Sequence, residues 1–221
     1  MMKILESCKK LFSKENLKKF FRTYIWLMVL LFVVDIVTKW AVVNHFGVDA
    51  MNYSVHSESG AIPVINGFCY IGGAINDKAA FSLGPSRVVL LLISLVMTGG
   101  FIAFYIIEYK KLNTVYKVAL ALMIAGGFGN LIDRAFYWPS TTGFNGVVDW
   151  IIFRFGSTES SEFAMFNIAD ACLVIGVILV IIEMIIEEIK AVKEKAKKGE
   201  YKYSPEELEK KKQEDEGNKS E

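Results

Sequence analysis

Two carboxylates lie where the chain enters a long apolar run. Asp170 is near the start of the run from Phe166 to Ile186, which is long enough to cross a bilayer. A charged side chain inside a membrane costs roughly 2.5–3.5 kcal/mol even on a lenient insertion scale, so it indicates a functional site by default. Asp149, in the sequence GVVDWIIF, comes shortly before this run. Two carboxylates that meet at one membrane face are typical of general acid–base chemistry on a bond presented by the lipid phase.

Other polar residues repeat this placement at the ends of apolar runs. Residues three or four apart share a helix face, as do Asn130 and Arg134 in GGFGNLIDR, and Asn167 and Asp170 in FNIADA. We expect six residues to gather at one membrane level: Asn130, Asp133, Arg134, Asp149, Asn167 and Asp170. An interfacial salt bridge is the alternative interpretation of Asp133 and Arg134.

Two further features have both a structural and a functional interpretation. Asp35 and Lys39 are four residues apart in the first apolar run, so they can neutralise each other on one helix face. A purely structural ion pair is the favoured interpretation, and the face must point into the helix bundle. The glycines before Asn130 (126, 127 and 129) allow either close helix packing or room for a substrate backbone.

The residue types favour an aspartic peptidase. Two neighbouring carboxylates beside an apolar wall cannot both ionise easily, so the pair shares a proton. The ionised member can then take a proton from water while the protonated member polarises a carbonyl. No G-x-S-x-G or P-loop motif is present, and His45 and His56 have no Cys or His at ligand spacing. We therefore expect neither a metal nor a cofactor.

The composition is that of an integral membrane protein. The chain has 221 residues and is 53% hydrophobic, with a mean hydropathy of +0.36. Four runs approach the ~20 residues that a bilayer requires; they are Tyr24–Val43, Val88–Ile107, Val115–Ile132 and Phe166–Ile186. The sequence thus predicts an all-α membrane protein with four transmembrane helices.

The distribution of basic residues predicts the topology. Seven Lys and Arg residues precede the first run, Lys110 and Lys111 follow the second, and the tail is Lys-rich from Lys190 on. The positive-inside rule therefore places both termini in the cytoplasm and the segments 44–87 and 133–165 outside.

Three segments flank or connect these runs. Residues 1–23 form a basic, amphipathic cytoplasmic lead-in, which either lies on an anionic inner leaflet or is simply solvated. Residues 44–87 form a small extracytoplasmic β element, with short strands expected at 62–65 and 68–71 between glycines and prolines. Residues 24–189 are the membrane domain, and 190–221 are a charged cytoplasmic tail expected to be disordered or a frayed helix.

Five motifs in order resemble those of lipoprotein signal peptidase, the type II signal peptidase of bacteria. They are DIVTK (35–39), NDKAAFS (76–82), GGFGNLIDR (126–134), VVDW (147–150) and FNIADA (166–171). Where the family usually has glycine two residues after the second motif's asparagine, this chain has Lys78.

This resemblance implies an aspartic endopeptidase of the bacterial plasma membrane that cuts a prolipoprotein before its diacylglyceryl-modified cysteine. It implies that Asp149 and Asp170 are catalytic. The residues implied to position substrate and dyad are Asn76, Asn130, Arg134 and Asn167, and the implied supporting residues are Asp35, Lys39 and Asp133. The expected partners are the prolipoprotein and membrane lipid, without nucleic acid, and the enzyme is expected to be a monomer with its active site at the outer leaflet.

A small transporter or proton-relay protein is the main alternative, because intramembrane Asp35, Lys39 and Asp170 would suit ion coupling. A scaffold whose polar residues only join helices is another. A need for Asp149, which lies outside the apolar runs, would favour the peptidase over both.

Overall fold

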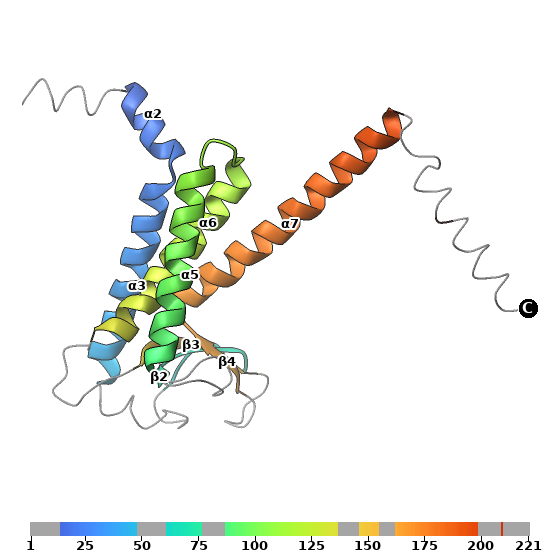
Figure 1. Cartoon of the computed structure of the whole chain (residues 1–221). Coiled ribbons are helices and arrows are strands. Elements are labelled where there is room, and N and C mark those ends of the chain that lie inside the picture. Colours follow the sequence, from blue (N-terminus) through green and yellow to red (C-terminus); the bar gives the residue numbers. More distant parts are fainter. Residues whose placement is uncertain are drawn as a thin grey trace, which may run out of the picture. The chain divides into compact units, whose positions relative to one another are not determined.

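The computed structural model describes residues 14–47, 61–76, 87–136, 146–154, 162–198 and 209. Two compact units, Met1–Leu179 and Val180–Glu221, make up the chain. The elements in chain order are α2 (Lys14–Arg22), α3 (Ile25–Phe46), β1 (Ile62–Ile65), β2 (Cys69–Asn76), α5 (Arg87–Glu108), α6 (Thr114–Ala135), β3 (Val147–Arg154), β4 (Glu162–Phe166) and α7 (Ile168–Lys197) (Figure 1).

Four of these helices, α3, α5, α6 and α7, are long and apolar enough to span a membrane. Their number and approximate positions confirm the four predicted runs. Helices α3, α5 and α7 each expose many large apolar side chains, as is expected of surfaces that contact lipid. Helix α6 is the most enclosed of the four, and small residues such as Ala119 and Ala121 let its neighbours approach closely.

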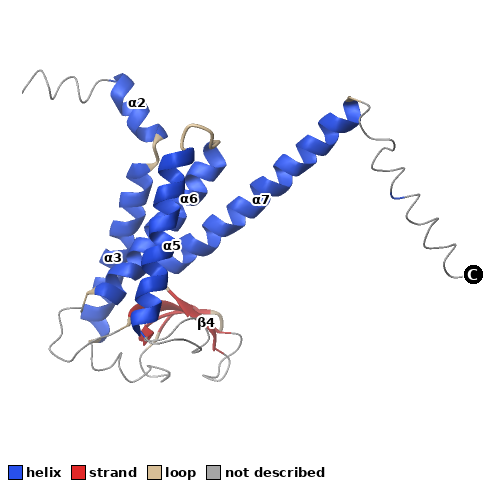
Figure 2. Ribbon diagram, viewed as in Figure 1, coloured by secondary structure: helices blue, strands red, loops and turns tan. Residues whose placement is uncertain are grey.

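A four-stranded antiparallel sheet, in the order β1-β2-β3-β4, lies at one end of α3, α5 and α6 (Figure 2). Strand β1 confirms the strand predicted at 62–65, and the stretch predicted at 68–71 falls largely within β2. Strand β3 and all of β4 except its last residue, Phe166, come from the segment 133–165, for which no strands were predicted. The overall fold prediction is confirmed, but the β element extends beyond the segment 44–87 because it also includes β3 and β4.

The sheet is fixed to the helices through β3. Val148 is fully buried and forms a cluster with Val42 and Val43, near the C-terminal end of α3. Between the pairs Ile71–Ile151 and Ala74–Asp149, β2 has one more residue than β3, so a bulge falls at Gly72 and Gly73. Bulges of this kind bend a strand and redirect the side chains beside it. Here the bulge lies directly before the residue that pairs with Asp149.

The ends of the chain differ from simple expectations. Helix α2 occupies the second part of the predicted lead-in at 1–23, and Tyr24, with φ 53°, separates it from α3. Helix α7 continues past the predicted boundary at residue 189 to Lys197. Cys8, Lys78 and, apart from residue 209, the chain after residue 198 lie outside the described residues.

Candidate active site

Asp149 and Asp170, here called the aspartate pair, come from different elements and are joined by one asparagine. Asp149 lies within β3, and Asp170 lies in the first turn of α7. The Nδ2 atom of Asn167, which is fully buried, donates to Asp149 Oδ1 at 2.8 Å. The Oδ1 atom of Asn167 accepts from the backbone N–H of Asp170 at 2.9 Å. Asn167 thus ties the strand carboxylate to the start of the helix that carries the second carboxylate.

Asn167 and Asp170 also form a reciprocal helix cap. The backbone N–H of Asn167 donates to Asp170 Oδ2 at 3.3 Å, while Asn167 Oδ1 accepts from the Asp170 N–H. This is the capping-box arrangement, in which two otherwise unpaired N–H groups at a helix start are satisfied. The cap fixes the Asp170 carboxylate at the helix N-terminus, where the helix dipole favours negative charge.

Asn130 and Asn76 supply further side-chain donors to the aspartate pair. Asn130 Nδ2 donates to Asp170 Oδ1 at 2.7 Å, and Asn76 Nδ2, at the end of β2, donates to Asp149 Oδ2 at 3.1 Å. Asn130 Oδ1 accepts from Asn167 Nδ2 at 3.1 Å. The structure therefore brings together five residues that the sequence singled out, each bonded to another through side-chain amides or carboxylates.

Burial changes the acidity of Asp149, which is only 3% exposed. Desolvation, followed by the neighbouring negative charge of Asp170, raises its pKa from 3.8 to about 7. Hydrogen bonds from Asn76 and Asn167 and the charge of Lys39 act in the opposite direction but do not outweigh the burial. A carboxyl group with this pKa can hold a proton near neutral pH, as general acid–base chemistry requires.

A second group of buried charges, here called the lysine cluster, lies beside the aspartate pair. Lys39 is fully buried and pairs with Asp35 at 2.7 Å and with Asp133 at 2.9 Å. Lys39 also donates to Asn130 Oδ1 at 3.1 Å. The predicted pairing of Asp35 with Lys39 is confirmed, and Asp133 joins it from α6.

The lysine cluster holds the residue immediately before each member of the aspartate pair. Asp35 Oδ1 accepts from the backbone N–H of Ala169 at 2.9 Å, and Asp133 Oδ2 accepts from that of Val148 at 3.2 Å. Ala169 precedes Asp170, and Val148 precedes Asp149. The cluster thus anchors β3 and α7 at the two points from which the carboxylates project.

The glycines of α6 make this arrangement possible through close packing. A Cβ atom on Gly129 would overlap Asp35 Oδ2 and lie 2.9 Å from Ala169 Cβ. A Cβ on Gly127 would lie 2.5 Å from Thr98 Oγ1, and one on Gly126 would overlap the carbonyl oxygen of Ala169. Of the two interpretations from sequence, these contacts support helix packing.

Arg134 lies one helical turn beyond Asn130 and is half-buried. Its Nη1 atom donates to Ser94 Oγ of α5 at 2.9 Å. Asp133, its neighbour in sequence, turns instead toward Lys39. Ser94 was not identified from sequence, because a lone serine in an apolar run has no distinguishing pattern.

Within the described ranges, no three His, Cys, Asp or Glu side chains are grouped as a metal site would require. Side-chain amides and a backbone N–H group donate to the aspartate pair, and such donors suit carboxylates.

The fold and site define a multi-pass membrane protein with two buried, hydrogen-bonded aspartates beside a small sheet. Residues 27–186 match the family described as signal peptidase (SPase) II, a family of aspartic peptidases, and the chain belongs to it. Two solved structures, each described as a bacterial membrane enzyme, are also similar. The first is 30% identical and covers 75% of this chain and 89% of its own, with a TM-score of 0.56. The second is 31% identical and covers 73% and 92%, with a TM-score of 0.53.

Membership of this family establishes the general activity. The protein is an aspartic endopeptidase of the bacterial membrane that removes signal peptides from prolipoproteins. The transporter or proton-relay alternative is not favoured.

Proposed function

We propose that Asp149 and Asp170 are the catalytic dyad of this peptidase. The observation that carries the proposal is the set of neutral donors on both carboxylates: Asn76 and Asn167 on Asp149, and Asn130 with the Asn167 backbone on Asp170. Neutral donors orient carboxylates without fixing both of them in the ionised form. Together with the raised pKa of Asp149, about 7, this favours a pair that shares one proton near neutral pH.

The proposed hydrolysis uses this shared proton. The ionised carboxylate takes a proton from a water molecule, whose oxygen attacks the carbonyl carbon of the scissile amide. The protonated carboxyl group donates its proton to the carbonyl oxygen as the C=O bond becomes single. When the tetrahedral intermediate collapses, the C–N bond breaks and the leaving nitrogen receives a proton from the first carboxyl group, while the carbonyl oxygen returns its proton to the second. The pair then regains its starting state.

The surrounding residues have separate roles in this proposal. Asn76, Asn130 and Asn167 hold the carboxylates, and Arg134, with up to five N–H donors, binds substrate carbonyl groups at the outer end of α6. Asp35, Lys39 and Asp133 position the dyad through the backbone of Ala169 and Val148.

The substrate and the orientation complete the proposal. The enzyme acts as a monomer at the outer leaflet of the plasma membrane and cuts before a diacylglyceryl-modified cysteine, whose lipid chains remain in the bilayer. The domain comprises residues 24–189, with the N-terminal lead-in and the charged tail in the cytoplasm. Lys110 and Lys111 lie between α5 and α6, at the opposite end from the sheet, which supports this orientation through the positive-inside rule.

A thiol-labelling experiment tests the orientation. Cys69 lies in β2 and is half-buried. A membrane-impermeant thiol reagent applied to intact cells should label Cys69 and not Cys8. Labelling of Cys8 alone would place the dyad on the cytoplasmic side and contradict the proposal.

Replacing Asp149 with asparagine tests the dyad. The new side chain could still accept one of the two hydrogen bonds, that from Asn167, through its amide oxygen. It would lose the bond from Asn76, and it cannot take or give the catalytic proton. We expect cleavage of a diacylglyceryl-modified prolipoprotein to fall by about 10²–10⁴-fold or more, with a Tm close to that of the parent. Glu108→Gln also converts a carboxylate to an amide, but at the C-terminal end of α5. This variant should cleave normally and serves as the matched control. Near-normal cleavage by Asp149→Asn would show that the assignment is wrong.

A further inference from the structure

Helix α2 has two unlike sides, and it lies outside the part of the chain that matches the family, which starts at residue 27. Phe20 and Phe21 are 46% and 53% exposed. At 100° per residue, the basic residues Lys18, Lys19 and Arg22 fall on the other side of the helix, and all three are exposed. A short helix with exposed aromatic residues opposite basic ones is the pattern of a segment that lies in a membrane interface.

Nearby side chains donate hydrogen bonds to the carbonyl groups at the C-terminal end of α2. The last carbonyl groups of a helix have no partner within the helix, and in solution water satisfies them. Thr23 Oγ1 donates to the carbonyl oxygen of Phe20 at 2.6 Å, and the indole N–H of Trp26 donates to that of Phe21 at 3.0 Å. The Trp26 ring also meets the Phe21 ring edge to face, with 5.7 Å between centroids. The turn from α2 into α3 is therefore held by side chains on both sides of it.

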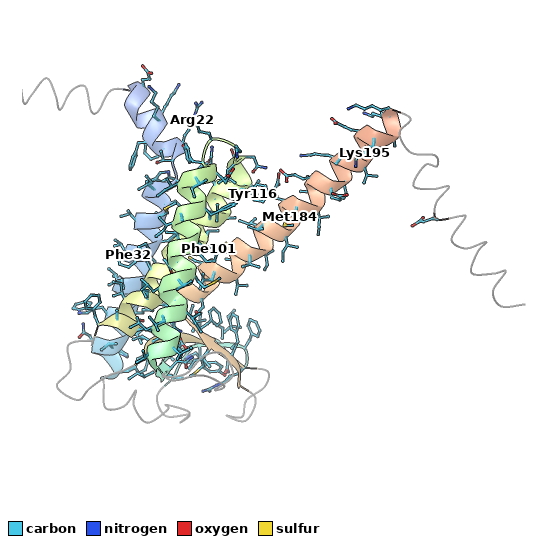
Figure 3. All side chains as sticks on the ribbon, viewed as in Figure 1. Arg22, Phe32, Phe101, Tyr116, Met184 and Lys195 are labelled. Carbon is cyan, nitrogen blue, oxygen red and sulfur yellow. The ribbon has the colours of Figure 1, made fainter. Side chains whose placement is uncertain are left out.

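Two tyrosines of α5 and the turn after it satisfy the next two carbonyl groups. Tyr109 Oη donates to the carbonyl oxygen of Arg22 at 3.3 Å, and Tyr105 Oη donates to that of Thr23. Arg22, labelled in Figure 3, is the last residue of α2. Four successive carbonyl groups at this helix end thus have protein donors. Such complete pairing is needed where water is scarce, as at a membrane boundary, and is unnecessary for a solvated lead-in.

The connection keeps α2 close to the bilayer. Only Thr23 and Tyr24 separate Arg22 from the first residue of the spanning helix α3, so the two helices are at most about 10 Å apart along the chain. The left-handed backbone of Tyr24, with φ 53°, makes a turn there rather than a continuous helix. The axis of α2 therefore turns away from that of α3 where the spanning helix begins.

We propose that α2 docks on anionic phospholipid, with Phe20 and Phe21 at the acyl boundary and Lys18, Lys19 and Arg22 against the headgroups. On the topology proposed above this is the cytoplasmic leaflet. Lys18 and Arg22 provide the charge complementarity together with Lys19, whose exposed pair with Glu15 at 2.8 Å must open to water or lipid at little cost. The spanning helix α3 makes the docked surface continuous with the membrane. Each basic residue near an anionic surface strengthens such docking by about fivefold.

Hydrogen exchange of the full chain in lipid nanodiscs tests this proposal. One set of nanodiscs contains phosphatidylcholine alone, and the other contains phosphatidylcholine with phosphatidylglycerol. The amides of residues 15–22 should exchange several-fold more slowly in the anionic nanodiscs. The double variant Lys18→Gln, Lys19→Gln keeps helix propensity and should lose most of this difference.

Lys110→Gln with Lys111→Gln is the matched control, because it removes two lysines from the loop between α5 and α6 at the same end of the molecule. This control should keep the slow exchange of residues 15–22. Equal exchange in the two lipids, or equal effects of the two double variants, would overturn the proposal. Exchange in anionic nanodiscs as fast as in an unfolded peptide would also overturn it and show a solvated lead-in. Both leaflets of a nanodisc have one composition, so a failure of the proposed topology or dyad would not change these outcomes.

Discussion

The lysine cluster and the aspartate pair are neighbouring groups of buried carboxylates that differ in what faces them. In the lysine cluster, Asp35 and Asp133 both contact the ammonium group of Lys39. In the aspartate pair, Asp149 and Asp170 contact amide groups. A cation within hydrogen-bond distance favours the ionised form of a carboxylate, whereas an amide orients the group and leaves it able to take up a proton when desolvated.

This difference suggests a division of labour. The carboxylates of the lysine cluster hold backbone positions in β3 and α7, while the aspartate pair is proposed to carry the exchangeable proton that hydrolysis needs. Asn130 connects the two groups, because its Oδ1 atom faces Lys39 and its Nδ2 atom faces Asp170.

The largest effect on stability is expected from Lys39→Met, which removes the cation of the lysine cluster. Two buried carboxylates would be left facing each other, and breaking a buried pair in this way costs about 3–5 kcal/mol. We expect a large drop in Tm in detergent. Lys111→Met is the control, because the Lys111–Glu108 pair is exposed and surface pairs contribute about 0–1 kcal/mol. If Lys39→Met were as stable as this control, the lysine cluster would not have the anchoring role assigned to it.

The sequence singled out most of the residues that the structure brings together at the candidate site, but it did not predict how they pair. Asp35 and Lys39 could be paired from their spacing, since four residues on a helix bring them to one face. Asp133 could not be assigned to Lys39, because these residues are far apart in sequence and only the packing of α3 against α6 brings them together. The salt bridge with the adjacent Arg134 was a reasonable local alternative.

Strand β3 shows a second limit of prediction from sequence. The stretch VVDWIIFR is nearly continuous in apolar residues, so periodicity does not distinguish a buried strand from the lead-in to a helix. Its partner β2 lies far away in the chain, and the register that sets Asp149 opposite Ala74 depends on the bulge at Gly72 and Gly73. By contrast, the capping box of Asn167 and Asp170 was visible as N-x-x-D before an apolar run, although only the shared face was inferred from it.

A smaller effect, mainly on activity, is expected from Arg134→Lys. This change shows which of the two groups Arg134 serves. Lysine keeps the charge but loses the planar fork, so if Arg134 positions the substrate near the aspartate pair, cleavage should fall by up to about 10²-fold with little change in Tm. Cleavage rate and Tm should be measured on the same preparation. Full activity with a lowered Tm would instead assign Arg134 to structural support beside Asp133.

The pH dependence of stability in the parent and in Asp149→Asn tests the central claim most directly. The pKa of Asp149 is raised from 3.8 to about 7 in the folded protein, so between these values the folded state binds more protons than the unfolded chain. Asp149 therefore lowers the stability of the parent as the pH rises from about 4 to about 7, and an asparagine at this position, which does not titrate, cannot contribute this loss. We predict that Tm, measured from pH 4 to pH 8, falls more steeply in the parent, so that Asp149→Asn becomes the relatively more stable protein at pH 8. Parallel curves, or a variant that loses stability relative to the parent as the pH rises, would contradict an aspartate pair that holds a proton near neutral pH.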